Sequence, residues 1–164
     1  MNTQSNETNV IVHMPSFKAI GLKWSGSFAE AGAGDIKHVH AQFRDRIDEI
    51  PHPLEADKLL GLSYHAHPGA EGFTHYITMK VDSQVTEAPP GMHLLEVPAL
   101  LYAKCEHRKG QNIGQSYQNL YKWIEEQGLR ASQGDLTHVE LYPRAQQPYD
   151  PDPEFTILIP VEDD

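Results

Sequence analysis

The sequence predicts an α+β fold in which two strand-helix-strand-strand units form antiparallel sheets. The chain has 164 residues, of which 39% are hydrophobic and 22% charged, a composition typical of one globular domain. Two segments with helical apolar spacing are separated by segments with the alternating pattern of strands. The two halves also share short cues, since MPSFKAIGL corresponds to VPALLYA and YITMKVD corresponds to TILIPVE.

The first unit is expected over about residues 10–82, after a disordered tail at residues 1–9. A strand pattern begins at Val10, runs through VIVHMPSFKAIGLKWSGSF and passes into the loop AEAGAGD. A helix is predicted next, with Asp35 as its N-cap and with Pro51 beyond its end. Its apolar positions fall at helical spacing, namely Ile36, Val39, Phe43, Ile47 and Ile50. Two strands complete the unit, KLLGLSYHAH and FTHYITMKVD.

The second unit is expected over about residues 92–162, so that residues 10–164 form a single domain. The linker SQVTEAPPGM precedes the strand HLLEVPALLYAKCEH and the turn RKGQ. The segment NIGQSYQNLYKWIEEQG predicts an amphipathic helix near residues 112–127, stopped at Gly128. Two more strands follow, from Thr137 to Tyr142 and from Phe155 to Val161.

Glu140 is a carboxylate within a predicted strand, in the segment THVELYP. Strand alternation places Val139 and Leu141 on one face and His138, Glu140 and Tyr142 on the other. We expect Val139 and Leu141 to pack under the helices, because each unit has one sheet face covered by its helix and one face bare. The bare faces would then form a central groove that contains Glu140.

Charge and hydropathy limit the function classes. The formal net charge is -10, with 13 Lys and Arg against 23 Asp and Glu, and the sequence has no basic run, recognition-helix pattern or zinc-finger spacing. We therefore expect no direct DNA binding by this chain. No stretch reaches the length of a membrane span and the N-terminal residues are polar, so we expect a cytoplasmic protein without membrane contact.

The cysteine and histidine content gives little support for a metal site. Cys105 is the one cysteine and is expected to be a small apolar residue within a strand. His38 and His40 diverge on a helix, whereas His65 and His67 share a face without a third ligand. We therefore expect no metal, no haem and no other cofactor.

The second half resembles the GyrI-like small-molecule-binding domain, also known as the AraC-type effector-binding domain. The resemblance rests on the VPA strand opening, the GQ turn, the helix YQNLYKWIEEQG, the strand VELY, the DP loop and the terminal IPVE. The segments AIGLKWSGSF and GLSY of the first half also fit. This resemblance implies a pseudo-twofold axis between the repeats and a bacterial protein related to the C-terminal domain of the regulator BmrR and to the SOUL superfamily.

The resemblance also implies a ligand site. In multidrug-binding relatives the glutamate of this strand segment, carried here onto Glu140, anchors lipophilic cations among aromatic rings. Tyr142 shares its face, and Tyr102, Tyr64 and Trp24 are further candidates for ligand binding, with core packing or strand pairing as the alternative for each aromatic residue. Trp123 and Tyr121 lie on the predicted helix, where core or rim positions are expected.

Three function classes follow from the resemblance. The first is a stand-alone module that binds or sequesters an amphipathic cationic small molecule, related to transcription regulators but without their helix-turn-helix domain. The second is a hydrolase of electrophilic small molecules that uses Glu140 as a catalytic acid or base. The third is a protein-interaction role, as in relatives that inhibit DNA gyrase, which the charge of -10 permits.

Overall fold

The computed structural model describes residues 9–67, 69–147 and 150–164. The predicted disordered tail lies outside these residues except for Asn9, which is buried, with only 8% of its surface exposed. No helix in the described ranges is both long enough and apolar enough to cross a membrane.

The fold is built on antiparallel strands, as the sequence predicted, and these strands join in one continuous sheet. Its strands run in the order β1-β6-β9-β8-β3-β4-β2-β5, and β7 pairs with β9. The bounds of the strands are β1 (Val10–Met14), β2 (Phe17–Gly26), β3 (Lys58–Tyr64), β4 (Phe73–Val81), β5 (His93–Val97), β6 (Leu100–His107), β7 (Leu129–Ala131), β8 (Leu136–Pro143) and β9 (Phe155–Asp163).

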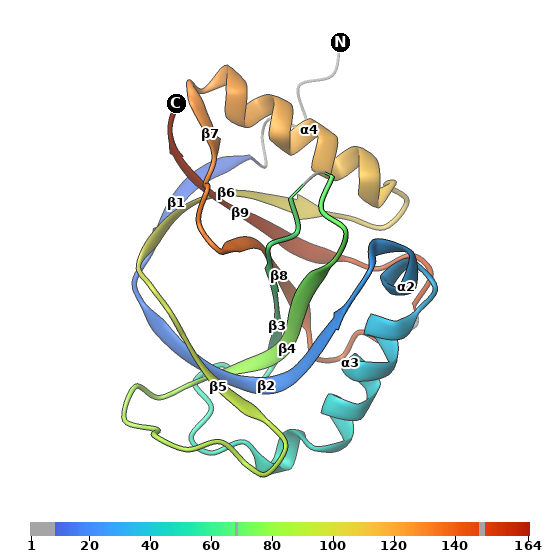
Figure 1. Ribbon diagram of the computed structural model, residues 1–164, viewed down its shortest axis with the longest axis vertical. Coiled ribbons are helices and arrows are strands. Elements are labelled where there is room, and N and C mark those ends of the chain that lie inside the picture. The colour runs from blue at the N-terminus through green and yellow to red at the C-terminus, as the bar shows by residue number, and fades with distance from the viewer. Residues whose placement is uncertain (1–8, 68, 148–149) are drawn as a thin grey trace.

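The strand order places the two halves of the chain side by side. The first half supplies β2, β4 and β3, the second half supplies β6, β9 and β8, and β3 pairs with β8 at the join. This order accords with two strand-helix-strand-strand units, whereas the pseudo-twofold axis stays a prediction. Figure 1 shows that the sheet curls into a ring, with the helices outside it.

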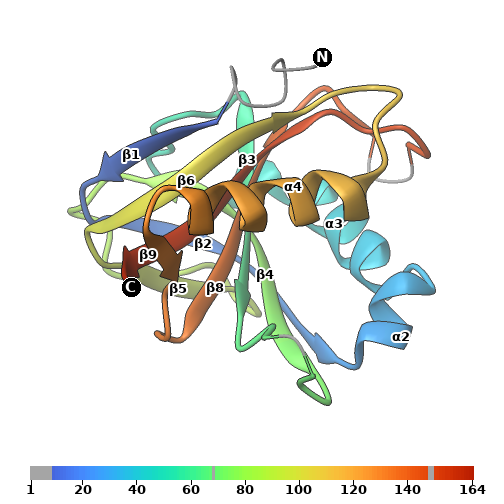
Figure 2. The same ribbon diagram turned by 90° about the horizontal axis from the view of Figure 1, so that it is seen from above.

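The helices lie on the outer face of the curled sheet. α3 (Asp35–Asp45) and the short 3-10 helix η1 (Ile47–Glu49) cover the first half, and α4 (Ile113–Glu126) covers the second. α4 begins after Asn112, whose side chain caps Gln115 N at 2.9 Å, and stops at Gly128, which has a φ of 75°. In Figure 2 the N-terminal end of α4 lies towards α3.

Several predicted boundaries were wrong for local reasons. A short helix, α2 (Phe28–Gly32), begins at the last residue of the predicted strand segment and continues into the loop AEAGAGD, because Ser27 and Glu30 form a reciprocal capping box. The N-cap of α3 is Gly34 rather than Asp35. Two expected single strands are each divided at a proline, which gives β1 with β2 and β5 with β6, and the short strand β7 was not predicted.

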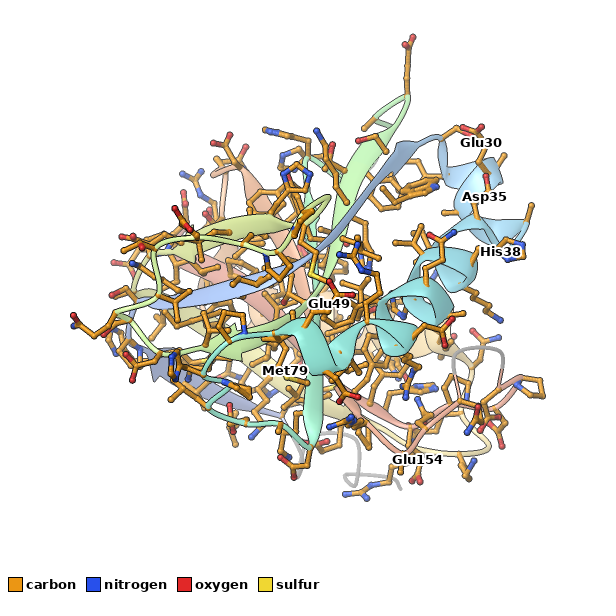
Figure 3. The ribbon with its side chains drawn as sticks, turned by 90° about the horizontal axis from the view of Figure 1, so that it is seen from below. Glu30, Asp35, His38, Glu49, Met79 and Glu154 are labelled. Carbon is orange, nitrogen blue, oxygen red and sulfur yellow. The ribbon has the colours of Figure 1, made fainter. Side chains whose placement is uncertain are left out.

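Three apolar clusters form the core. One lies between α3, η1 and the outer face of the first half, with Phe43 and Met79 fully buried, and another lies under α4 around Leu120 and Ile157. The third consists only of strand residues on the concave face of the sheet. Figure 3 shows Met79 in the interior and His38 on the outer side of α3.

The predicted assignment of the two faces of β8 was wrong. Val139 is 2% exposed and packs in the cluster on the concave face, with Leu141 partly buried against it. Glu140 instead lies on the face that carries the helices, where a residue of α4 contacts it. The face without helices is not bare, because the curled sheet encloses it. The groove therefore lies between the helices.

Candidate functional site

A cavity of about 390 Å³ opens on the outer face of the sheet, between α2 and α3 on one side and α4 on the other. Its floor is the join of the two halves, where Gly61 pairs with Glu140 and Ser63 pairs with His138. Both halves therefore contribute to its lining. The residues that line it are Phe28, Ile36, Ser63, Ala66, His67, Phe73, His75, Tyr117, Tyr121, His138, Glu140 and Tyr142.

Glu140 is held by two phenol groups. The hydroxyl of Tyr117, from α4, donates to Oε2 of Glu140, and the hydroxyl of Tyr142, from the same strand, donates to Oε1. Each carboxylate oxygen therefore has one fixed donor. Within the described residues, Glu140 has no Lys or Arg partner.

Burial dominates the electrostatics of Glu140. Loss of hydration raises the pKa of its carboxyl group above the ordinary value, and the hydrogen bonds from Tyr117 and Tyr142 act in the opposite direction. The pKa of each tyrosine is raised well above its ordinary value, first by burial and then by the charge of Glu140. The tyrosines therefore remain neutral donors, and a negative charge on Glu140 is costly without a positive partner.

Burial holds three histidines of the site, His138, His75 and His40, in the neutral form. His138 Nε2 lies 2.6 Å from the hydroxyl oxygen of Tyr121, and burial lowers the pKa of His138 to about 4. His75 is bonded through Nδ1 to Ser63 Oγ at 2.9 Å and through Nε2 to His40 Nε2 at 3.1 Å. Burial lowers the pKa of His40 to about 4 and that of His75 well below its ordinary value.

Gly61 provides the space in which these rings lie against the sheet. An added Cβ at Gly61 would stand 2.9 Å from Cε1 of His75 and 3.3 Å from Cε2 of Tyr142. The ring of Tyr142 in turn contacts His40 edge-on, with 5.4 Å between the ring centroids. A side chain at position 61 would therefore displace His75 and press on Tyr142, which holds Glu140.

Aromatic rings form the outer wall of the cavity. Phe28 of α2 stacks on Phe73 of β4 at 4.8 Å between centroids, and Trp24 of β2 meets the far side of this pair at 5.3 Å from Phe73. Phe28 is 44% exposed although it is a large apolar side chain. The wall therefore presents an open aromatic face to the cavity.

The structure brings together only part of the site set that the sequence predicted. Glu140 and Tyr142 line the cavity. Tyr102 and Tyr64 lie in the cluster on the concave face, and Tyr102 is fully buried there with its hydroxyl unpaired. Trp24 contacts Phe73 and does not line the cavity. Tyr102, Tyr64 and Trp24 are thus separated from Glu140 by the sheet or by another ring.

Several residues of the cavity were not among the predicted site residues. Tyr117 was not singled out, and Tyr121 was expected at a core or rim position of its helix. The four-residue spacing of these two tyrosines was the signal that both could reach one strand. Phe28 was missed because it was placed at the end of a predicted strand segment and α2 was not predicted. In the part of the chain that the structure describes, no three His, Cys, Asp or Glu side chains converge as metal ligands do. Cys105 is buried, which raises the pKa of its thiol to about 11.

Comparisons with known proteins add a family and a fold. The model of the GyrI-like small molecule binding domain matches residues 9–162, whereas no curated protein matches the chain in sequence. Among solved structures, the EcmrR C-terminal domain is similar, with a TM-score of 0.67 and 13% identity over 95% of this chain and 98% of that one. The chain spans 57% of the EcmrR chain in its complex with DNA.

Two further structures are similar over nearly their whole length. SAV2435 bound to tetraphenylphosphonium has a TM-score of 0.65 and 14% identity, with 94% of this chain and 93% of that chain covered. A hydrolase from Listeria innocua has a TM-score of 0.58 and 12% identity, with 94% and 92% covered. At these identities the likeness establishes the fold alone.

Proposed function

The chain belongs to the GyrI-like small-molecule-binding domain family, and we propose that its cavity binds lipophilic aromatic cations, with Glu140 as the anionic anchor. The observation that carries the proposal is the position of Glu140. Its carboxylate is buried between two tyrosine hydroxyls and has no cationic partner within the described residues. A bound cation would supply the charge that the protein does not.

The composition of the cavity supports the same ligand class. Its volume of about 390 Å³ falls within the range of small-molecule sites. Glu140 is the only carboxylate among its described lining residues, and none of them is Lys or Arg. Phe28 and Phe73 offer aromatic faces, and each such face attracts a cation by about 0.5 to 2 kcal/mol. A relative of the same fold is bound to tetraphenylphosphonium, a cation of this class.

Calorimetric titration tests the proposal with three probes of related shape: tetraphenylphosphonium, the neutral triphenylphosphine oxide and the anion tetraphenylborate. We expect the cation to bind most tightly. Glu140→Gln keeps the shape and removes the charge, so it should weaken the cation by about 1.5 to 3 kcal/mol, the value of a charged hydrogen-bond partner, and barely change the neutral probe.

The control variant is Glu125→Gln, which removes the same charge from an exposed position on α4. It should leave all three affinities unchanged. Equal losses for the cation and the neutral probe in Glu140→Gln would show that Glu140 shapes the cavity without recognising charge, and the proposal would then fail.

Hydrolysis is a second candidate function, favoured by one specific observation. Glu140 has a raised pKa and faces a cavity of the size of small-molecule sites, so its carboxylate is suited to deprotonate a water molecule that attacks a bound electrophile. A hydrolase has the same fold. The test is hydrolysis of an epoxide or an activated ester. Activity that is lost in Glu140→Gln and retained in Glu125→Gln would support this function over binding alone.

A further inference from the structure

A second cavity of about 250 Å³ adjoins the first and shares Ile36, Glu140 and Tyr142 with it. It lies on the other side of Tyr142, between α3 and the first residue of α4. Its described lining includes Lys37, His40, Arg44 and Asp150. Lys37 and Arg44 contribute positive charge to the second cavity, whereas the described lining of the first cavity contains no Lys or Arg.

Arg44 is a guanidinium group whose hydrogen-bonding capacity is not satisfied. Its Nη1 donates to the backbone carbonyl of Arg144, but its Nε is buried without a hydrogen-bond partner. No carboxylate forms an ion pair with Arg44 within the described residues. Burial and the nearby charge of Arg144 lower its pKa, so its positive charge is destabilised where it lies. A buried, unpaired donor of this kind is costly unless an acceptor arrives.

The acidic groups of the second cavity do not neutralise Arg44. Asp150 lies 3.5 Å from Lys109 and accepts a hydrogen bond from the backbone N–H of Asp152. Glu140 is held by Tyr117 and Tyr142 on the side shared with the first cavity. The pKa of Asp150 is lowered first by the hydrogen bond from Asp152 and further by the charges of Lys109 and Lys37, so Asp150 already interacts with Lys37 of α3. Arg44 is left without an ion-pair partner among the described residues.

A short series of contacts links Glu140 to Arg44, the two charged groups that lack an ion-pair partner among the described residues. The hydroxyl of Tyr142 holds Glu140, and the ring of Tyr142 meets His40 at 5.4 Å between centroids. Arg44 follows His40 by four residues on α3, which places it on the same helix face about 5 to 6 Å further along. One small molecule can therefore reach both Glu140 and Arg44.

From these contacts we propose that the ligand is amphoteric, with its positive centre against Glu140 and a carboxylate against the guanidinium of Arg44. The inference rests on the proposed function and extends it by naming a second charged group on the ligand. The guanidinium fork matches a carboxylate in geometry, and Nε is one of the donors that such a pair uses. Lys37 adds positive charge to the same cavity.

Two triphenylphosphonium probes test the inference, one with a pentyl arm and one with a carboxybutyl arm. The wild-type protein should bind the carboxylate probe at least about tenfold more tightly, the factor that corresponds to about 1.4 kcal/mol. Arg44→Gln should abolish this preference, so that the two probes bind to the variant with the same affinity. Arg44→Lys, which keeps the charge but loses Nε–H, should retain part of the preference.

Lys122→Gln is the control, because it removes a positive charge from an exposed position on α4. The inference is overturned if the pentyl probe binds in a Glu140-dependent manner but the carboxylate adds nothing, or if Lys122→Gln and Arg44→Gln reduce the preference equally. If the pentyl probe does not bind, or binds equally well to Glu140→Gln, the proposed function fails and the inference fails with it.

Discussion

Removing the hydroxyl of Tyr142 should raise the pKa of Glu140 and shift the pH range in which a cation binds. The hydroxyl donates to Oε1 of Glu140 and stabilises its charged form. A hydrogen bond to a charged group contributes about 1.5 to 3 kcal/mol. Since each pKa unit corresponds to about 1.36 kcal/mol, Tyr142→Phe should raise the pKa of Glu140 by roughly one to two units.

The sign of the binding effect follows from the charge. Protonation of Glu140 removes the anion with which the cation pairs, so affinity for tetraphenylphosphonium should fall as the pH falls through the pKa of the carboxyl group. In Tyr142→Phe this loss should begin at a higher pH than in the wild-type protein. NMR titration of ¹³C-labelled glutamate side chains measures the pKa directly, and calorimetry at a series of pH values measures the binding.

Tyr121→Phe is the matched control for Tyr142→Phe. It removes a phenol hydroxyl from the same cavity, but that hydroxyl bonds to His138 and not to Glu140. We expect Tyr121→Phe to leave the pKa of Glu140 unchanged. An unchanged pKa in Tyr142→Phe, or an equal shift in both variants, would refute the reasoning that individual hydrogen bonds set the charge of Glu140.

Two further predictions concern the support of the site. Burial lowers the pKa of His40 from 6.5 to about 4, so between these pH values His40 is protonated in the unfolded chain but not in the folded protein. The wild-type protein should therefore lose roughly 3 kcal/mol of its free energy of unfolding as the pH falls through this range. In urea unfolding, the free energy by which His40→Phe is less stable than the wild-type protein should therefore decrease from pH 7 to pH 4. A difference that stays constant over this range would contradict the prediction. Gly61→Ala should destabilise the protein by about 1 to 3 kcal/mol through overpacking against His75 and Tyr142 and should weaken cation binding. Gly32→Ala is the control, because no neighbouring atom lies within 4 Å of the added Cβ. It should change neither the stability measured by thermal unfolding nor the cation affinity measured by calorimetry.

The sequence predicted the elements of the fold better than their environment. Alternation in β8 correctly separated Val139 and Leu141 from Glu140 and Tyr142, because strand geometry fixes which side chains share a face. It could not say which face carries the helices. That depends on the curl of the sheet, which is set by the pairing of strands distant in sequence, such as β3 with β8.

The aromatic residues of the site show the same limit. Tyr64 and Tyr102 were selected as counterparts of Tyr142, but their positions along their strands direct them to the concave face. Phe28 could be predicted as a cavity residue only by recognising α2. The Ser27 and Glu30 pattern of a capping box is readable in the sequence, so this part of the cavity wall was open to prediction. The contact between Tyr117 and Glu140 required the packing of α4 on β8.

The match between α4 and β8 explains why Glu140 is held rigidly. Tyr117 bonds to Glu140 and Tyr121 bonds to His138, so the order of the partners along the helix is the reverse of their order along the strand. Four helical residues advance about 6 Å and two strand residues advance about 6.8 Å, so both bonds can form at once. A slip of one residue in α4 would turn both hydroxyls away, because each residue rotates the helix by about 100°. The carboxylate is therefore fixed before a ligand arrives, and the ordering cost of placing it is met during folding rather than during binding.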